Sequence, residues 1–205
     1  MSEARIGRIV AAALHQAVVD VLPLRLEFYE SYLEPRRLRT GTVGVASFWA
    51  ALSFLRRDGD AYPLVMSEAG RRAADWMWET VPGYQAASWR RLPSAWRARV
   101  VLRLARRLVS DTLTTSRATS RVRRGTGRLV IEGSGFCDPR AAASAPLCGF
   151  YVAAVERLCQ HLAVAGRVGA EACRGMSGEA CVVVLRLGAG DETRESDPQS
   201  AEAAP

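Results

Sequence analysis

Lysine and asparagine are both missing from this chain of 205 residues, and only two histidines occur in it. All 28 basic residues are therefore arginines, against 21 acidic residues, and the net charge is +7. Abundant alanine, arginine, valine and glycine suggest a GC-rich coding sequence, so part of the arginine content reflects codon usage. With 49% hydrophobic and 24% charged residues, the composition is that of a globular protein and excludes a chain disordered throughout.

Long hydrophobic runs are also missing. No stretch of 18 apolar residues occurs, so the sequence predicts no membrane span. The apolar stretch near the N-terminus follows Glu3 and has no clean cleavage site, and we interpret it as a helix rather than a signal peptide. These features favour a cytoplasmic protein.

Recognisable catalytic motifs are missing too. The sequence contains no GxSxG, P-loop, dinucleotide-binding glycine pattern after a strand, HExxH or paired-carboxylate motif. Two histidines also give little support for a general base. Whether the protein is an enzyme therefore stays open at this point.

Hydrophobic periodicity predicts a helical N-terminal half, with helices over about 1–20, 43–55 and 67–81, and a helical block over about 89–112 that is interrupted at Pro93. Ser67 is a predicted N-cap. Alternating segments at 117–135 and 167–187 predict two β-hairpins, with Val122, Leu129 and Ile131 facing inward. Between them, 146–164 predicts an amphipathic helix that starts at Pro146. We expect an α+β domain over 1–187, with a helical half packed on a small antiparallel sheet, and a disordered acidic tail over 188–205.

Arginines are concentrated in the middle of the chain, where 12 of them and only one acid, Asp111, lie between Arg90 and Arg128. A stripe on the predicted helix after Pro93 could contact phosphates of a nucleic acid or an acidic partner. No helix-turn-helix, zinc-finger or RNA-binding motif accompanies it, so a solvated helix face is the preferred interpretation and nucleic-acid binding an alternative. The stripe consists of Arg97, Arg99, Arg103, Arg106 and Arg107.

The tryptophans all lie in the helical half, where they are expected mainly in the core. The alternative is a pocket between helices for a hydrophobic small molecule. The residues predicted to line such a pocket are Trp49, Trp76, Trp96 and Phe150.

Five cysteines lie in the last third of the chain: Cys137, Cys148, Cys159, Cys173 and Cys181. In a hairpin symmetric about Ser177, Cys173 and Cys181 face each other, at a Cα separation of about 5 Å. Glu171 would project from the same face as Cys173, and Cys148 lies in the first turn of the preceding helix. Cys148, Glu171, Cys173 and Cys181 are thus a candidate zinc site.

Two observations weigh against zinc. Free cysteines often are simply small buried residues, and the spacing lacks CxxC pairs. Cys159 is an unfavourable ligand because it lies about 16 Å along the helix from Cys148. Cys137 and His161 are reserve candidates, whereas His15 fits a half-buried helix position.

The run APLCGFYVAAVERLCQHL followed by EACRGMSGEACVVVL resembles the 4-vinyl reductase domain family, in which a helix that begins with a cysteine precedes a hairpin carrying two more. The resemblance extends over about Ser67 to Leu187. It implies a fold like that of the TRAPP subunits, a homodimer, and a bound hydrophobic molecule. It also implies zinc held by three cysteines and a glutamate. The family's glutamate position is occupied here by Ala170, and Glu171 is displaced by one residue.

Two functions follow from the resemblance. The first is a sensory or carrier domain for an apolar, aromatic or tetrapyrrole ligand, with a structural zinc. The second is a 4-vinyl reductase of bacteriochlorophyll synthesis or its accessory protein. A reductase requires a hydride source, and since no nucleotide-binding motif occurs, direct reduction would need a separate partner.

Overall fold

The computed structural model describes residues 5–33, 43–84, 87–137, 143–176 and 178–188. The first half is helical and includes two short strands, β1 and β2, that pair antiparallel. Its elements, in chain order, are β1 (Arg5–Ile6), α1 (Arg8–Val21), η1 (Pro23–Arg25), α2 (Leu26–Leu33), β2 (Val43–Gly44), α4 (Val45–Arg57) and α5 (Ala61–Glu79).

The second half contains the main sheet. Its four strands are all antiparallel to their neighbours, in the order β3-β4-β6-β5. This arrangement confirms the predicted α+β class, with two hairpins on either side of a helix in the sequence. The elements are η2 (Pro82–Tyr84), η3 (Ala87–Arg91), α6 (Ser94–Thr112), β3 (Arg117–Arg123), β4 (Thr126–Glu132), α7 (Gly149–His161), β5 (Gly166–Ala172) and β6 (Cys181–Leu187).

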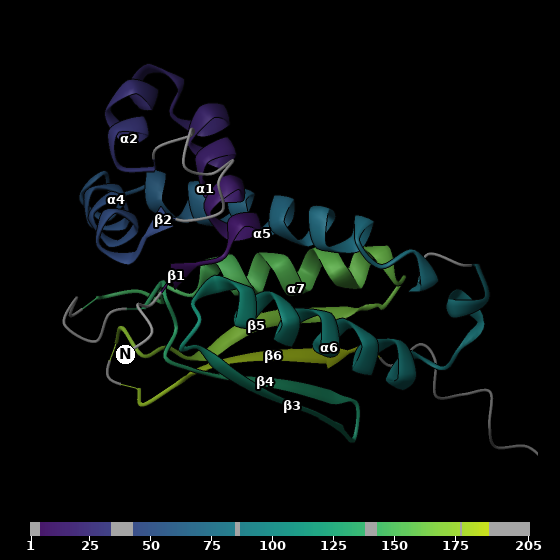
Figure 1. Ribbon diagram of the computed structural model, residues 1–205. Coiled ribbons are helices and arrows are strands. Elements are labelled where there is room, and N and C mark those ends of the chain that lie inside the picture. The colour runs from purple at the N-terminus through teal and green to yellow at the C-terminus, as the bar shows by residue number, and fades with distance from the viewer. Residues whose placement is uncertain (1–4, 34–42, 85–86, 138–142, 177, 189–205) are drawn as a thin grey trace, which may run out of the picture.

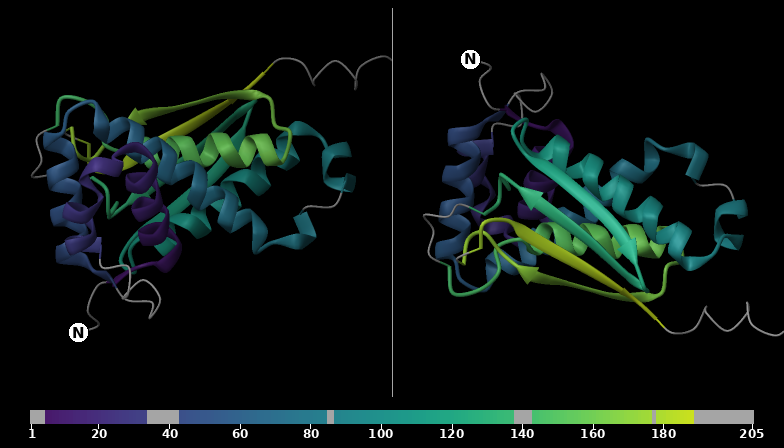
Figure 2. Two further views of the ribbon diagram at one scale, coloured as in Figure 1. Left: turned by 90° about the horizontal axis from the view of Figure 1, so that it is seen from above. Right: turned by 90° about the horizontal axis from the view of Figure 1, so that it is seen from below.

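The helices form layers on one side of this sheet (Figure 1). Helices α6 and α7 lie on the sheet, α5 packs on α7, and α1 packs on α5. Gly70 permits the close approach of α5 to α7, because a Cβ at this position would lie 2.2 Å from the backbone oxygen of Phe150. Seen from below, the other face of the sheet carries none of the described helices (Figure 2).

Local sequence explains the first hairpin. Arg124 and Gly125 both have positive φ, 48° and 68°, which is the backbone conformation of a two-residue turn that matches the twist of paired strands. Leu129 and Ile131 are fully buried against the helices, as predicted, and Val122 is half-buried. Alternation along β3 and β4 therefore gives the sheet one apolar face and one polar face.

Two predicted helix starts are wrong. Helix α5 begins at Ala61, directly after the Asp58-Gly59-Asp60 turn, so Ser67 lies inside the helix, where its Oγ accepts a hydrogen bond from Arg71. Helix α7 begins at Gly149 with Cys148 as its N-cap, and Pro146 precedes it. The residues before α7 are held instead by tertiary contacts, including a hydrogen bond from the Leu147 N–H to Cys173 Sγ.

Within the described ranges, no single helix is long and apolar enough to cross a membrane. Helix α1 and the η1–α2 segment meet that criterion only as a pair, bent by 113°. The predicted tail lies outside the described residues from 189 onward, so its disorder and the proposed domain boundary stay predictions.

Candidate metal centre

Four cysteine thiols meet at the end of the sheet that carries the β5–β6 connection. The Sγ atoms of Cys137, Cys148, Cys173 and Cys181 all lie within 4.8 Å of one another. The four residues are at most 3% exposed, and none forms a disulfide. They come from the segment after β4, the N-cap of α7, the residue after β5 and the first residue of β6.

The spacing of the thiols is within the range of a metal site with four sulfur ligands. A metal ion with four sulfur ligands at about 2.3 Å requires sulfur atoms about 3.8 Å apart. Cys137 Sγ and Cys173 Sγ are 3.6 Å apart, far beyond the roughly 2.05 Å of a disulfide bond. One small ion at the centre would therefore reach all four sulfurs.

Backbone amides support the sulfurs on the hairpin. The Leu147 N–H donates to Cys173 Sγ at 3.3 Å, and the Arg174 N–H donates to Cys181 Sγ at 3.4 Å. The carbonyl of Cys173 accepts hydrogen bonds from the Met176 and Gly178 amides, which closes the turn after the first hairpin cysteine. Donors of this kind stabilise thiolates, which are the form of cysteine that binds metals.

The thiols differ strongly in acidity. Hydrogen bonding, led by the Cys137 thiol, lowers the pKa of Cys173 to about 6 and that of Cys181 to about 3. Hydrogen bonds with the neighbouring sulfurs raise the pKa of Cys137. At Cys148, the Cys137 hydrogen bond lowers the pKa, but the contact with Cys181 together with burial outweighs it and raises the pKa. Two of the four sulfurs thus favour the thiolate at neutral pH, and the other two favour the thiol.

Helices α4 and α5 hold the residues next to two of the cysteines. Trp49 Nε1 donates to the Gly135 carbonyl at 3.0 Å, and Arg56 Nη2 donates to the Phe136 carbonyl at 2.7 Å. Tyr62 Oη donates to the Leu147 carbonyl at 3.0 Å. The segments that precede Cys137 and Cys148 are therefore fixed by the N-terminal helices, which links those helices to the cluster.

The structure brings three of the predicted zinc ligands together, with Cys137 in place of Glu171. Glu171 is the extra residue of a β-bulge between Ala170 and Ala172, which turns it away from the cysteines. Its exposed carboxylate pairs with Arg128 at 2.9 Å. The periodicity of two residues that placed Glu171 beside Cys173 fails at this bulge, and nothing in the local sequence indicates the bulge.

The fifth cysteine and the two histidines, including the reserve candidate His161, lie elsewhere. Cys159 is buried in α7, and burial raises the pKa of its thiol to about 12. His161 lies at the end of α7, where its Nε2 is 2.6 Å from Asp75 and its ring stacks on Trp78. His15 is 3.2 Å from Glu30 on the helical side of the molecule. None of the three belongs to the sulfur cluster.

The residues predicted to line a ligand pocket are scattered over four helices. Trp49 is 45% exposed and donates a hydrogen bond to the Gly135 carbonyl. Trp96 is 57% exposed and lies beneath the guanidinium of Arg99. Phe150 is fully buried against Phe136, with ring centroids 4.4 Å apart, and Trp76 is half-buried on α5. The structure does not bring these four side chains together around one hollow.

The predicted arginine stripe on α6 has mixed roles. Arg97 donates to the carbonyls of Leu162 and Ala163, so it joins α6 to the end of α7. Arg99 stacks on Trp96. Arg103, Arg106 and Arg107 are exposed on the outer side of the helix.

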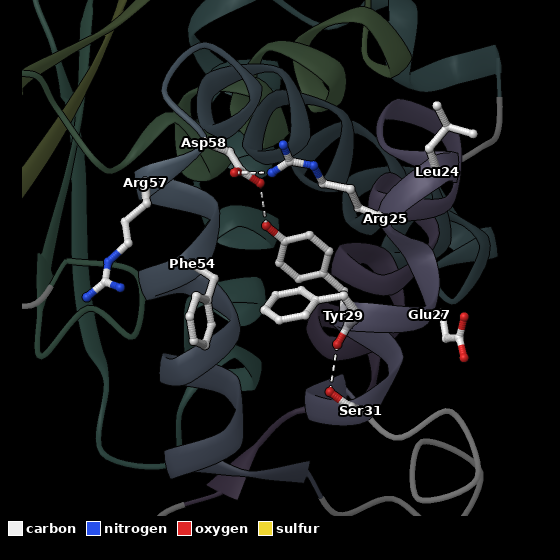
Figure 3. Close-up of a pocket in the computed structure, with 9 residues that line it drawn as sticks. Leu24, Arg25, Glu27, Tyr29, Ser31, Phe54, Arg57 and Asp58 are labelled. Carbon is white, nitrogen blue, oxygen red and sulfur yellow. Dashed lines mark hydrogen bonds and ion pairs between the residues drawn. The ribbon is translucent and has the colours of Figure 1, made fainter.

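An open hollow of about 650 Å³ lies between the η1–α2 segment and α4 (Figure 3). Arg25 and the Tyr29 hydroxyl both bond the Asp58 carboxylate on one side of it, Tyr29 at 2.7 Å. These contacts, led by the Tyr29 hydrogen bond, lower the pKa of Asp58. Phe28 and Phe54 form its apolar wall, and no histidine or cysteine lines it.

Comparison with known proteins gives a fold and no family. No family model and no curated protein matches the sequence. Among solved structures, an H-NOX protein of Shewanella oneidensis in the Fe(II) state, a triple mutant, matches with TM-score 0.57 and 13% identity over 92% of this chain and 98% of that chain. The solution structure of an H-NOX domain from Shewanella oneidensis in the Fe(II)CO state matches with TM-score 0.54 and 12% identity over 90% and 99%.

These matches correct the resemblance drawn from the sequence. Assignment to the 4-vinyl reductase domain family is wrong, since no family model supports it and the similar structures are H-NOX domains. The functions derived from it, a ligand-binding member of that family and a bacteriochlorophyll reductase or accessory protein, are withdrawn with it. A short motif of three cysteines around a helix and a hairpin indicates a local arrangement and is too short to specify a family.

Proposed function

We propose that this protein is a zinc-binding domain on an H-NOX-like fold, in which a tetracysteine site joins the sheet to the N-terminal helices. The observation that carries this proposal is the convergence of four buried, unbridged thiols within 4.8 Å. Four separate segments supply them, so chance proximity along one helix or strand does not account for the cluster.

The donor set favours zinc among common metal ions. Four sulfurs within 4.8 Å of one another suit Zn²⁺ or a single iron, whereas Ca²⁺ and Mg²⁺ prefer oxygen ligands. Zinc is almost always tetrahedral in sites with four sulfur ligands. A purified protein that contained iron instead would be coloured, so the two metals are easily distinguished.

The site supports a structural role. All four coordination positions would be filled by protein sulfurs, which leaves none open for water or substrate. The metal would fix the β5–β6 hairpin, the start of α7 and the segment after β4 to one another. Because Arg56, Trp49 and Tyr62 hold the adjacent backbone, the metal would also determine how α4 and α5 sit on the sheet.

The H-NOX neighbours were solved in Fe(II) states, and a tetrapyrrole is among the ligands predicted from the sequence. The 650 Å³ hollow between the η1–α2 segment and α4 does not fit an iron tetrapyrrole. Both histidines are paired with carboxylates, and the 650 Å³ hollow has neither histidine nor cysteine in its wall. The only described tyrosine in that wall, Tyr29, already donates a hydrogen bond to Asp58 and is not free to bind iron.

Metal analysis of the purified full chain tests the proposal. We expect about one zinc per chain, and loss of zinc when Cys181 is replaced by serine. Cys159→Ser is the matched control, because it removes a buried cysteine of the same domain outside the cluster. A zinc content near zero in protein produced with zinc available, or equal zinc in both variants, would overturn the proposal.

A further inference from the structure

A cluster of arginines lies at the opposite end of the sheet from the cysteines, on the face that no described helix covers. Its members come from all four strands and the β3–β4 turn. They are Arg121, Arg123, Arg124, Arg128, Arg167 and Arg186, here called the arginine face. A shallow hollow of about 240 Å³ on this face is lined by Arg121, Arg123, Arg124, Thr126 and Arg128.

Strand register forces like charges together on this face. Arg121 pairs directly with Arg128, and Arg167 pairs directly with Arg186. Side chains at directly opposed positions lie on the same side of a sheet, and like charges there repel. An arrangement with two such pairs needs compensating negative charge.

The described part of the chain supplies little of that charge. Glu171 pairs with Arg128. Among the described residues, no carboxylate pairs with the other five arginines of the arginine face. By contrast, Arg25, Arg72 and Arg157 all have carboxylate partners on the helical side. The arginine face thus carries positive charge that the described residues leave largely unbalanced.

The segment that follows β6 has the complementary charge. Residues 188–205 contain five acidic residues and one arginine, and four of the acids fall within 191–197. The chain enters this segment at the arginine face itself: the Leu187 N–H donates to the Gly125 carbonyl in the β3–β4 turn at 2.9 Å, and the Gly188 N–H donates to the Ala165 carbonyl next to β5. Asp191 follows Gly188 by three residues, a reach of about 10 Å.

We infer that the acidic segment 189–205 binds the arginine face of its own chain and shields it from other anions. The interaction needs only a short reach, so even weak ion pairs are favoured by a high effective concentration. It depends on exposed charges, so salt weakens it. This inference is independent of the metal site.

The primary test compares the full chain with a variant carrying Asp191→Asn, Glu192→Gln, Glu195→Gln and Asp197→Asn. Amide and arginine Nε NMR signals of 121–128, 165–168 and 186 should shift between the two proteins at low salt. The shifts should vanish in about 0.3 M salt, where the screening length is below 10 Å. Unchanged signals at low salt would overturn the inference.

Binding of inorganic tripolyphosphate gives a second readout. The neutralised variant should bind it about three- to tenfold more tightly than the unaltered chain at low salt, because the internal competitor is lost. Adding Arg121→Gln and Arg186→Gln to that variant should remove the gain, whereas Arg103→Gln and Arg106→Gln on α6 should leave it. Equal affinity of the unaltered and neutralised chains, or a gain that survives loss of Arg121 and Arg186, would contradict the inference.

Discussion

The two ends of the β-sheet place reactive or charged side chains together in opposite ways. At one end four thiols are buried, and donors from the surrounding backbone and helices orient them and their segments. At the other end, arginines oppose arginines at the surface with few described partners. We propose that an ion closes the buried cluster and that the acidic residues after β6 balance the exposed one. The same antiparallel pairing thus gathers buried thiols at one end and exposed arginines at the other.

The largest effect is expected at the sulfur end. Cys173→Ser should abolish zinc binding and lower the free energy of unfolding by about 4 kcal/mol or more, because metal binding contributes to folding. Urea denaturation with and without a chelator measures this difference. Cys159→Ser should lose far less, and its stability should still fall when zinc is chelated. Equal losses in the two variants would show that the four thiols are merely buried side chains.

The acidity of the thiols gives a second prediction. In metal-free protein, the lowered pKa of Cys173, about 6, means that the folded state binds fewer protons than the unfolded state between about pH 6 and 9. The Cys173 thiolate therefore stabilises the fold at high pH, and its contribution to the free energy of unfolding is lost as the pH falls toward 6. The raised pKa values of Cys137 and Cys148 act oppositely above pH 9. Zinc binding at pH 7.5 should release about two protons rather than four, as measured by calorimetry in buffers of different ionisation enthalpy.

The link between α4 and the cluster should have an intermediate effect. Arg56→Met leaves the Phe136 carbonyl without its donor, so we expect a loss of about 1–3 kcal/mol in stability. Zinc affinity should fall roughly tenfold, as for other groups that position ligands. Arg57→Met is the matched control, because Arg57 is exposed and lies over the ring of Phe54. Competition with a chromophoric chelator measures the zinc affinities of both variants. Unchanged zinc affinity in Arg56→Met would show that the contact from α4 does not help to position the ligands.

The smallest effect is expected at the arginine end of the sheet, where we expect a substitution to raise the free energy of unfolding instead of lowering it. In the chain whose residues 191, 192, 195 and 197 are neutralised, Arg121→Gln removes a repulsion with Arg128 and should raise the free energy of unfolding by about 0.5 kcal/mol at low salt. The gain should disappear at high salt. Destabilisation at low salt in that background would show that Arg121 has another partner, outside the acidic segment, that outweighs the repulsion.

Patterns with a clear period predicted most of the fold. Alternation placed Leu129 and Ile131 in the core, and helical spacing found α4, α6 and α7 within a few residues. The predicted pairing of the last two strands brings Cys173 and Cys181 together, whereas Ser177, its predicted centre, lies outside the described residues. Helix starts were less accurate, because Ser67 and Pro146 are favourable residues at positions where tertiary contacts determine where the helix begins.

The rest of the site depends on features without a local signal. Glu171 leaves the cluster because of one extra residue in β5, and Cys137 enters it through the path of the segment after β4. That path is held by Trp49 and Arg56, which lie more than 75 residues earlier in the sequence. The arginine face likewise could not be predicted from the sequence. Register across four strands, and not a local run of arginines, brings its members together.

X-ray absorption at the zinc edge of the purified full chain would show directly whether the four cysteines hold zinc. We expect four sulfur neighbours at about 2.3 Å and no nitrogen or oxygen ligand. A first shell that contains nitrogen or oxygen, or a protein that retains no zinc after purification, would contradict it.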